Sequence, residues 1–336
     1  MKIALFYPMN VMASWYALGG YSAALERLGH TVLDCPFPGN QVAGVELLRQ
    51  VMPSMDDLAG CDVVLSMFHE YTQPWLAALY GEEAWLALME KVPVVGRFDE
   101  SMDRADLNLP HRVPDLLRWC TLSSFPAKQD AIRWAGQWLP FGADVEMFKP
   151  VDEEGAASPK MYELAFVGSL YPMRLKYGQA LQRELPQGLF LRTGQVIVSD
   201  LGGPLKLAST SLLAENYRRV KVFFCLPPMS RLLVCKVFEV LACGSFLMYP
   251  ELPGDAAGNM SCFEDGKHLV YYKGGHVKKN VKQILQYLEH EDEREAIAAR
   301  GCQLVREKYT LDSMLQQLLM LAQNPFHDRY MEVGAT

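Results

Sequence analysis

The chain has 336 residues, of which 50% are apolar and 21% charged, and its net charge is −7. This length suits two domains of about 150 residues each, and the composition is typical of a folded rather than a disordered protein. The mild acidity argues against broad electrostatic binding to nucleic acid or an anionic membrane, although it leaves room for a local basic patch.

The eight cysteines are scattered singly, without a CxxC pair or a Cys/His cluster at zinc spacing. We therefore expect no bound metal. Cys235 and Cys243 lie in apolar runs, as expected for small core residues in a reducing compartment. The opening MKIALFYPMN is too short for a signal sequence, and no apolar run reaches 18 residues without a charge. These features predict a cytoplasmic protein without a transmembrane helix.

The first half of the chain alternates predicted strands and helices. Residues 2–8 predict a buried strand, residues 21–28 have the helical spacing and end at Gly29, and residues 31–37 predict a second strand. Further strands are expected at three places: 61–68, 92–98 and 119–125. The order strand, helix, strand predicts a parallel sheet with both faces covered.

The polar stretch DEEGAASPK, residues 152–160, predicts a linker, and the same alternation restarts after it. Strands are expected at 162–170, 188–196, 219–227, 244–251 and 268–274, and helices at 278–289, 292–308 and from a Thr310 cap to about 322. Two α/β halves predict a ligand cleft outside the carboxyl ends of the strands.

Two sites in the first half are candidates for function. Gly19 and Gly20 precede a helix, where backbone N–H groups can approach an anion, although a plain flexible turn fits equally. They form neither a GxGxxG fingerprint nor a Walker A loop. His69 and Asp99 each follow a predicted strand, so we consider both as catalytic residues. The alternatives are a hydrogen-bonded loop histidine and an aspartate that caps a helix.

In the second half, FVGSLYPMRLKYG places Gly168 at the end of a strand and Arg174 and Lys176 shortly after it. Backbone N–H groups near Gly168 and the Arg174 guanidinium would suit a diphosphate. Solvated charges at the start of a helix are the alternative, and Lys176 fits this alternative better.

The stretch KVFEVLACG places Lys236 and Glu239 on one face of a predicted helix that begins near Ser230. Arg231 would then lie in its first turn. A phosphate-bearing ligand along this helix would meet the cations first, and Glu239 could accept two hydroxyl protons from a sugar. An i,i+3 ion pair between Lys236 and Glu239 is the alternative.

The C-terminal half resembles the glycosyl transferase group 1 family and, within it, the spore-maturation-protein-like branch. The likeness is carried in order by FVGSLYPMR, ENYRRVKVFF, SRLLVCKVFEVLACGSFLMYPE, FEDGKHLVYYKGG and EREAIAARGCQLVREKYT. The junction WLPFGADVEMFKP and the N-terminal YP…GG…LERLGHTV are similar to segments of GT-B glycosyltransferases.

The resemblance implies a GT-B fold of two Rossmann-like parallel-sheet domains facing across a cleft. Residues 1–150 would form the acceptor side and residues 151–310 the nucleotide-sugar side. Residues 311–336 would form a helix and tail, for which packing against the first domain is one option. The implied activity is transfer of a sugar, in the manner of a hexosyltransferase, from a nucleotide-diphosphate-sugar to an unidentified acceptor.

The resemblance also implies roles for single residues. Glu239 matches the glutamate that holds the donor ribose, Lys236 and Arg174 stand where cations face the diphosphate, and Gly168 lies where the chain turns beneath it. Gly20 matches the loop that approaches the donor from the other domain. The acceptor would lie near His69 and Asp99, on the first domain.

One departure from the family concerns Arg231, which stands eight positions before Glu239, where many members have a glutamate that contacts the transferred sugar. We include Arg231 among the donor-binding residues. Retention of configuration is the family expectation. We expect no metal and no cofactor besides the co-substrate, a UDP-sugar, and a monomer or homodimer.

Other activities remain open at this point. One is a GT-B-type epimerase or phosphorylase, another is a non-catalytic sugar- or nucleotide-binding protein, and a two-domain dehydrogenase is disfavoured by the missing glycine fingerprint. The acceptor could be a small molecule, a glycan, a protein or a modified nucleic-acid base.

Overall fold

The computed structural model describes residues 1–9, 20–38, 42, 44–152, 154–168, 170–194 and 210–323. The chain divides into two compact units, of which the first comprises Met1–Pro140 and the residues from Asp312 onward, and the second Phe141–Leu311. The predicted linker at 152–160 therefore lies inside the second unit, because the division falls after Pro140. Gly19 lies outside the described residues.

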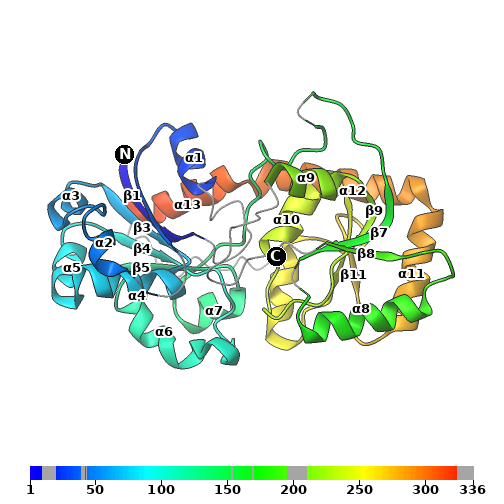
Figure 1. The fold of residues 1–336 in the computed structure, drawn as a ribbon, viewed down its shortest axis with the longest axis horizontal. Helices are drawn as coiled ribbons and strands as arrows, with labels where there is room; N and C mark the ends of the chain where they lie inside the picture. Colours follow the sequence, from blue (N-terminus) through cyan, green and yellow to red (C-terminus); the bar gives the residue numbers. More distant parts are fainter. Residues whose placement is uncertain are drawn as a thin grey trace, which may run out of the picture. The chain divides into compact units, whose positions relative to one another are not determined.

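The first unit is built on a six-stranded parallel sheet with the order β2-β1-β3-β4-β5-β6 (Figure 1). The strands are β1 (Lys2–Pro8), β2 (Thr31–Phe37), β3 (Val63–Met67), β4 (Val94–Arg97), β5 (Leu122–Phe125) and β6 (Gln137–Trp138). The first five confirm predicted strands, whereas the two-residue β6 was not expected. Every residue of β3 and β4 is buried, as expected for central strands covered on both faces.

Helices accompany this sheet in the order of the chain. They are α1 (Gly20–Arg27), α2 (Val45–Leu48), α3 (Met55–Ala59), α4 (His69–Tyr80), α5 (Glu82–Met89), η2 (Ala105–Leu107), α6 (Leu109–Leu117), α7 (Lys128–Arg133) and α13 (Leu311–Gln323). An ion pair of 2.6 Å joins Arg27 of α1 to Asp312 of α13, so the C-terminal helix packs within the first unit. Gly29 has the positive φ of 83° expected of the residue that ends α1.

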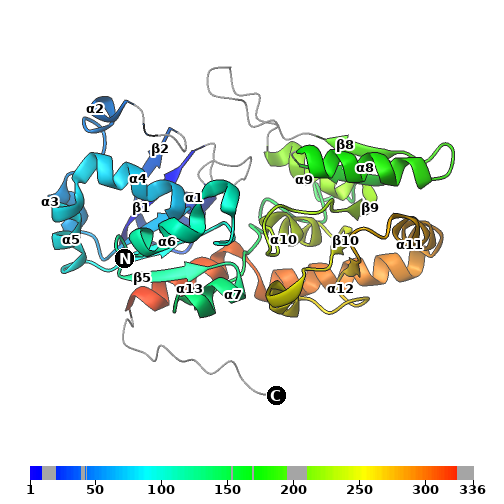
Figure 2. The ribbon, with the colours of Figure 1, turned by 90° about the horizontal axis from the view of Figure 1, so that it is seen from below.

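The second unit holds a five-stranded parallel sheet with the order β11-β10-β9-β7-β8. Figure 2 shows three of its strands, β8, β9 and β10, near α8 and α10. Its strands are β7 (Tyr162–Val167), β8 (Leu191–Gly194), β9 (Val220–Phe224), β10 (Phe246–Pro250) and β11 (Val270–Tyr272). Its helices are α8 (Pro172–Glu184), α9 (Thr210–Arg218), α10 (Cys235–Ala242), η3 (Gly254–Cys262), α11 (Val277–Glu289) and α12 (Glu291–Lys308). The strand predicted at 188–196 is shorter, and residues 195–196 lie outside the described part of the chain.

The start of α10 differs from the prediction. The helix begins at Cys235 rather than near Ser230, and Val234 before it is extended. The carbonyl of Arg231 accepts a hydrogen bond from Asn259 Nδ2 at 3.2 Å, and the carbonyl of Leu232 accepts one from the Tyr249 hydroxyl at 2.9 Å. Because these tertiary bonds occupy carbonyls that a longer helix would use, the first turn forms later in the chain.

Each sheet has a position where the strand order reverses. In the first unit, β1 lies between β2 and β3, and in the second, β7 lies between β8 and β9. In α/β proteins, connections leave such a strand toward opposite faces, and ligands commonly bind outside its carboxyl end. Candidate ligand-binding residues are therefore expected after β3 and β4 in the first unit and after β7 and β9 in the second. No helix in the described ranges is both long and apolar enough to cross a membrane.

Candidate functional site

His69 opens α4 in the first unit and its side chain is fully buried. Its Nε2 lies 2.9 Å from the carbonyl oxygen of Leu116, and its Nδ1 lies 2.7 Å from the Ser66 hydroxyl. Since a carbonyl only accepts, Nε2 carries the proton and Nδ1 accepts from Ser66. Burial lowers the pKa of His69 to about 4. Neither ring nitrogen is left for a substrate, so the geometry matches the hydrogen-bonded histidine and not the predicted catalytic role.

Asp99 follows β4 and is equally enclosed. One carboxylate oxygen accepts the backbone N–H of Phe68 at 3.0 Å, and the other accepts Nε of the buried Arg97 at 3.3 Å. Burial raises the pKa of Asp99 to about 6, against the opposing effect of Arg97. Phe68 has a φ of 49°, an uncommon value for a bulky residue, and Asp99 holds this turn before α4. Asp99 therefore ties two strand ends together, which does not fit a catalytic group exposed to an acceptor.

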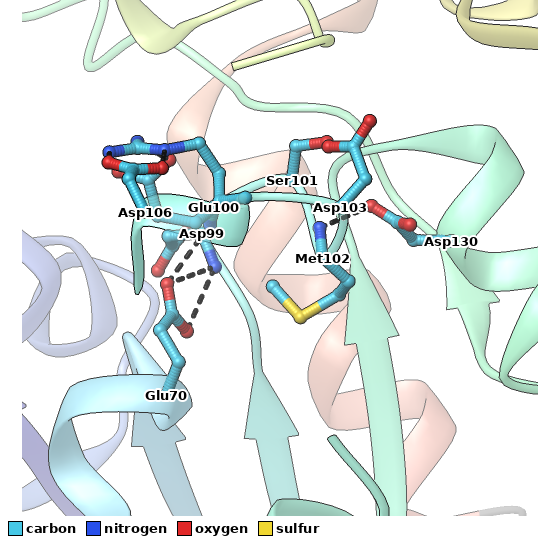
Figure 3. Close-up of polar contacts among 9 residues, drawn as sticks. Glu70, Asp99, Glu100, Ser101, Met102, Asp103, Asp106 and Asp130 are labelled. Atoms are coloured by element: carbon cyan, nitrogen blue, oxygen red, sulfur yellow. Dashed lines mark hydrogen bonds and ion pairs between the residues drawn. The ribbon is translucent and has the colours of Figure 1, made fainter. Parts of the chain in front are cut away.

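The segment after β4 is held by two further carboxylates (Figure 3). The fully buried Glu70 accepts the backbone N–H of Glu100 at 3.0 Å and that of Asp99 at 3.2 Å. Asp130 of α7 accepts the backbone N–H of Met102 at 2.9 Å. Burial and the charge of Asp99 raise the pKa of Glu70 well above its usual value. These contacts hold the segment from α4 and α7, and they form an internal network among the residues named here.

Gly168 ends β7 in the second unit and has a φ of 149°. This backbone conformation strongly favours glycine. A Cβ built on Gly168 would overlap Lys236 Nζ and would lie 3.0 Å from the ring of Phe166. The missing side chain therefore allows the amine of α10 to lie against the turn after β7. Gly168 and Lys236, predicted from distant parts of the sequence, are neighbours in the fold.

Arg174 of α8 reaches the same place. Its Nε donates to the carbonyl of Pro227 at 3.0 Å, and the Tyr171 hydroxyl donates to that same carbonyl at 2.6 Å. Pro227 follows β9, so these bonds bridge the ends of the two strands at which the strand order reverses. Arg174 is 7% exposed despite its charge. Positive charge thus lies beside the carboxyl ends of β7 and β9.

Lys236 lies beside Arg174, with its Nζ 4.7 Å from the centroid of the Phe166 ring. Within the described part of the chain, Lys236 makes neither a hydrogen bond nor an ion pair, which rules out the ion pair with Glu239. Burial lowers the pKa of Lys236, and the charge of Arg174 acts in the same direction. A ligand anion would relieve both effects.

Glu239 lies one turn further along α10 and is 2% exposed. Its Oε2 accepts a hydrogen bond of 3.3 Å from the Tyr217 hydroxyl, whereas its Oε1 is buried without a partner among the described residues. Burial raises the pKa of Glu239 to about 7, although Lys236 opposes the shift. Buried polar atoms are usually satisfied, so the unpaired oxygen is an unused acceptor about one helical turn from Lys236. The sequence did not point to Tyr217, because Tyr217 and Glu239 are joined by a hydrogen bond between distant segments and no spacing in the chain indicates such a contact.

Two predicted donor residues lie elsewhere. Arg231 pairs with Asp255 and donates to the carbonyl of Pro253 at 3.2 Å, so its guanidinium is engaged with the start of η3. It precedes α10 instead of forming its first turn. Gly20 is buried as the first residue of α1 in the first unit. Among the described residues, no group of three or more His, Cys, Asp and Glu side chains could hold a metal ion.

These two sheets, each parallel and covered by helices, define the GT-B class of fold, which solved structures support. Anabaena HepE, solved with UDP and glucose, is 14% identical with a TM-score of 0.63, over 96% of this chain and 100% of HepE. Sucrose-phosphate synthase from Thermosynechococcus elongatus is 12% identical with a TM-score of 0.65, over 97% and 99% of the two chains. A glycosyltransferase from Rickettsia africae is 10% identical with a TM-score of 0.63, over 97% of this chain and 99% of the Rickettsia chain.

The family comparison concerns the part of the chain that carries Lys236 and Glu239. Residues 205–320 match the family model described as glycosyl transferase-like. This match includes Lys236 and Glu239, and it confirms the resemblance to glycosyltransferases, while the spore-maturation-protein-like branch stays a prediction. A search of curated proteins found none that is similar.

Proposed function

We propose that the protein is a glycosyltransferase that takes a sugar from a nucleotide-diphosphate-sugar bound by the second unit. The observation that carries this proposal is a set of unused polar groups near the carboxyl end of β7, where the strand order of the second sheet reverses. Among the described residues, Lys236 Nζ lies against Gly168 without an ion pair, and Glu239 Oε1 is buried without a donor. Both groups lie within the segment that matches the glycosyl transferase-like family model.

The cations fit the diphosphate of such a donor. As the bond between sugar and diphosphate breaks, negative charge develops on the leaving oxygen, and fixed positive groups stabilise it. Arg174 and Lys236 would supply that charge, and the absent side chain of Gly168 would let the diphosphate approach the backbone. Because two cations already provide what a divalent ion provides elsewhere, we expect transfer without added metal.

Glu239 would hold the ribose. Its unpaired Oε1 can accept a hydroxyl proton, and its Oε2 is oriented by Tyr217. A carboxylate that gains hydroxyl donors is stabilised in its charged form, so binding would lower the raised pKa of Glu239 again. Satisfying a buried acceptor contributes about 1–3 kcal/mol in comparable cases.

The donor base, the stereochemistry and the acceptor belong to the same proposal. A UDP-sugar is the donor that we propose, since the similar fold of HepE was solved with UDP and glucose. Retention of configuration and hexosyl transfer follow from the resemblance. The first unit would bind the acceptor, with Gly20 approaching the donor. The buried state of His69 and Asp99 removes them from the proposed machinery.

A thermal-shift screen of nucleotide sugars and free nucleoside diphosphates tests the proposal. At 100 times its dissociation constant, a ligand stabilises the folded protein by about 2.7 kcal/mol. Glu239→Ala should fold and lose this stabilisation, whereas the matched control Glu264→Ala, at an exposed glutamate paired with Lys267, should keep it. Stabilisation that survives in Glu239→Ala would refute the ribose assignment. Products formed from a nucleotide sugar without an acceptor, beyond slow hydrolysis, would indicate an epimerase or phosphorylase instead.

A further inference from the structure

Phe166 is the aromatic residue around which the two cations gather. It lies near the end of β7 and is fully buried. The guanidinium carbon of Arg174 lies 5.0 Å from the centroid of its ring, and Lys236 Nζ lies 4.7 Å from the same centroid. Both distances are within the roughly 6 Å at which a cation is attracted to the face of an aromatic ring. One ring thus contacts two cations that come from different helices.

The two cations differ in how much else holds them. Arg174 also donates to the carbonyl of Pro227, and its guanidinium lies 4.4 Å from the centroid of the Tyr171 ring. For Lys236, the ring of Phe166 and the turn at Gly168 are the contacts that the structure shows around the amine. Removing the ring should therefore affect Lys236 more than Arg174.

A ring holds a cation differently from a carboxylate. An Asp or Glu in the place of Phe166 would form an ion pair and neutralise the positive charge, which would then be less available to a second anion. The ring quadrupole attracts the cation without adding a net charge. A cation held in this way keeps its charge for a ligand, and its side chain is already ordered before the ligand binds.

We propose that Phe166 is a positioning residue that holds Arg174 and Lys236 for the diphosphate of the donor without neutralising them. This inference rests on the proposed function, because it assumes that a nucleoside diphosphate binds there. It makes a separate claim, however, since a diphosphate could bind these cations whether or not the ring orders them. The ring itself does not contact the reacting atoms in this role.

Fluorinated phenylalanines test this role with little change in shape. Mono-, di- and trifluorophenylalanine at position 166 weaken the negative face of the ring stepwise, so cation–ring attraction falls while packing is nearly kept. We expect the affinity for UDP to fall with each added fluorine, by about tenfold in total, because a cation–ring contact contributes roughly one factor of ten. Binding of uridine, which lacks the diphosphate, should not change along the series.

The matched control is the same fluorinated series at Phe246, a buried residue of β10 whose ring packs on Tyr287 at 4.7 Å. That series should leave the affinity for UDP unchanged. A UDP affinity that stays constant or rises along the Phe166 series would overturn the inference, as would an equal loss for uridine. If neither UDP, GDP nor ADP binds the unmodified protein, the proposed function itself fails, and the two failures are thereby distinguished.

If a fluorinated variant at position 166 expresses poorly, Phe166→Tyr and Phe166→Leu decide the question in its place. Tyrosine keeps the aromatic face and should keep the preference for UDP over uridine. Leucine removes the face and should lose that preference by about tenfold. Equal preferences in the two variants would overturn the inference.

Discussion

The carboxyl ends of the two sheets carry polar residues that are arranged in opposite ways. In the first unit, Asp99 and Glu70 both accept hydrogen bonds from neighbouring backbone N–H groups, and Asp99 also accepts one from Arg97. In the second unit, Lys236 makes no ion pair and Glu239 has an unpaired oxygen within the described residues. Both clusters lie at strand ends, but among the described residues it is the second that holds a carboxylate oxygen without a hydrogen-bond donor and a lysine without an ion pair.

This difference shows how a scaffold can be told from a binding site. A closed network of buried charges is strongly interdependent, since removal of one partner leaves the others uncompensated. An open cluster costs stability in the free protein and regains it when a ligand supplies the missing partners. Substitutions in the first cluster should therefore lower stability, whereas substitutions in the second should change binding and preserve or raise stability.

The largest expected effect comes from a matched pair of substitutions, Arg97→Met and Lys236→Met. Arg97 donates to Asp99, to Ser124 at 3.1 Å and to the carbonyl of Leu139 at 2.5 Å. Its loss should lower the free energy of unfolding by about 3–5 kcal/mol, as for other broken buried pairs. Lys236→Met removes a cation that makes no ion pair, so the loss is limited to its contact with the Phe166 ring, and the free energy of unfolding should change by less than about 2 kcal/mol.

Urea unfolding of both variants measures this contrast, with UDP binding as a second readout. Arg49→Met provides a control, since its ion pair with Glu46 is exposed and should contribute only about 0.5 kcal/mol. Equal losses of stability in Arg97→Met and Lys236→Met would show that the two clusters are alike. Unchanged binding of UDP by Lys236→Met would remove this lysine from the donor site.

The next effect is a pH dependence caused by Glu239. Burial raises its pKa from the usual 4.5 to about 7, so the folded state holds this proton more tightly than the unfolded state. Between these two values the unfolded state binds fewer protons, and stability falls as the pH rises. The loss of folding stability caused by ionising Glu239 is absent below about pH 4.5 and complete above about pH 7, where it reaches about 3 kcal/mol.

Glu239→Gln removes this ionisation and should therefore be more stable than the wild type at pH 8, with a smaller difference at pH 5. Thermal unfolding across this pH range checks the sign and the window. The same variant should bind UDP more weakly, because an amide is a poorer acceptor for ribose hydroxyls than a carboxylate. A stability difference that does not vary with pH would show that Glu239 stays ionised throughout.

The sequence predicted the parts of this molecule that depend on local pattern. Short apolar runs between helical segments gave every strand except β6, which has only two residues. Gly168, Arg174, Lys236 and Glu239 could be proposed as site residues because strand ends and helix spacing are visible in the chain. The structure brings Gly168 and Lys236 together, and it joins Arg174 to the same aromatic ring.

What the sequence could not predict depends on contacts between distant segments. His69 and Asp99 follow their strands as catalytic residues would, yet Leu116 and Arg97 enclose them. A strand-end residue that is satisfied by its neighbours and one that awaits a ligand look the same in the sequence. The ring of Phe166 was likewise invisible, since a buried phenylalanine in a strand first suggests a core.

The smallest effect is expected from Arg231, which was predicted to bind the donor. It is paired with Asp255 at an exposed site, where ion pairs contribute about 0–1 kcal/mol. Arg231→Ala should therefore change the stability by less than about 1 kcal/mol and the affinity for UDP by less than twofold. Asp255→Ala, which removes the carboxylate paired with Arg231, distinguishes a structural role of Arg231 from a donor-binding role. If Arg231 contacts the donor during binding, Asp255→Ala will tighten UDP binding and Arg231→Ala will weaken it, so that Arg231 would join the incomplete cluster instead of the scaffold.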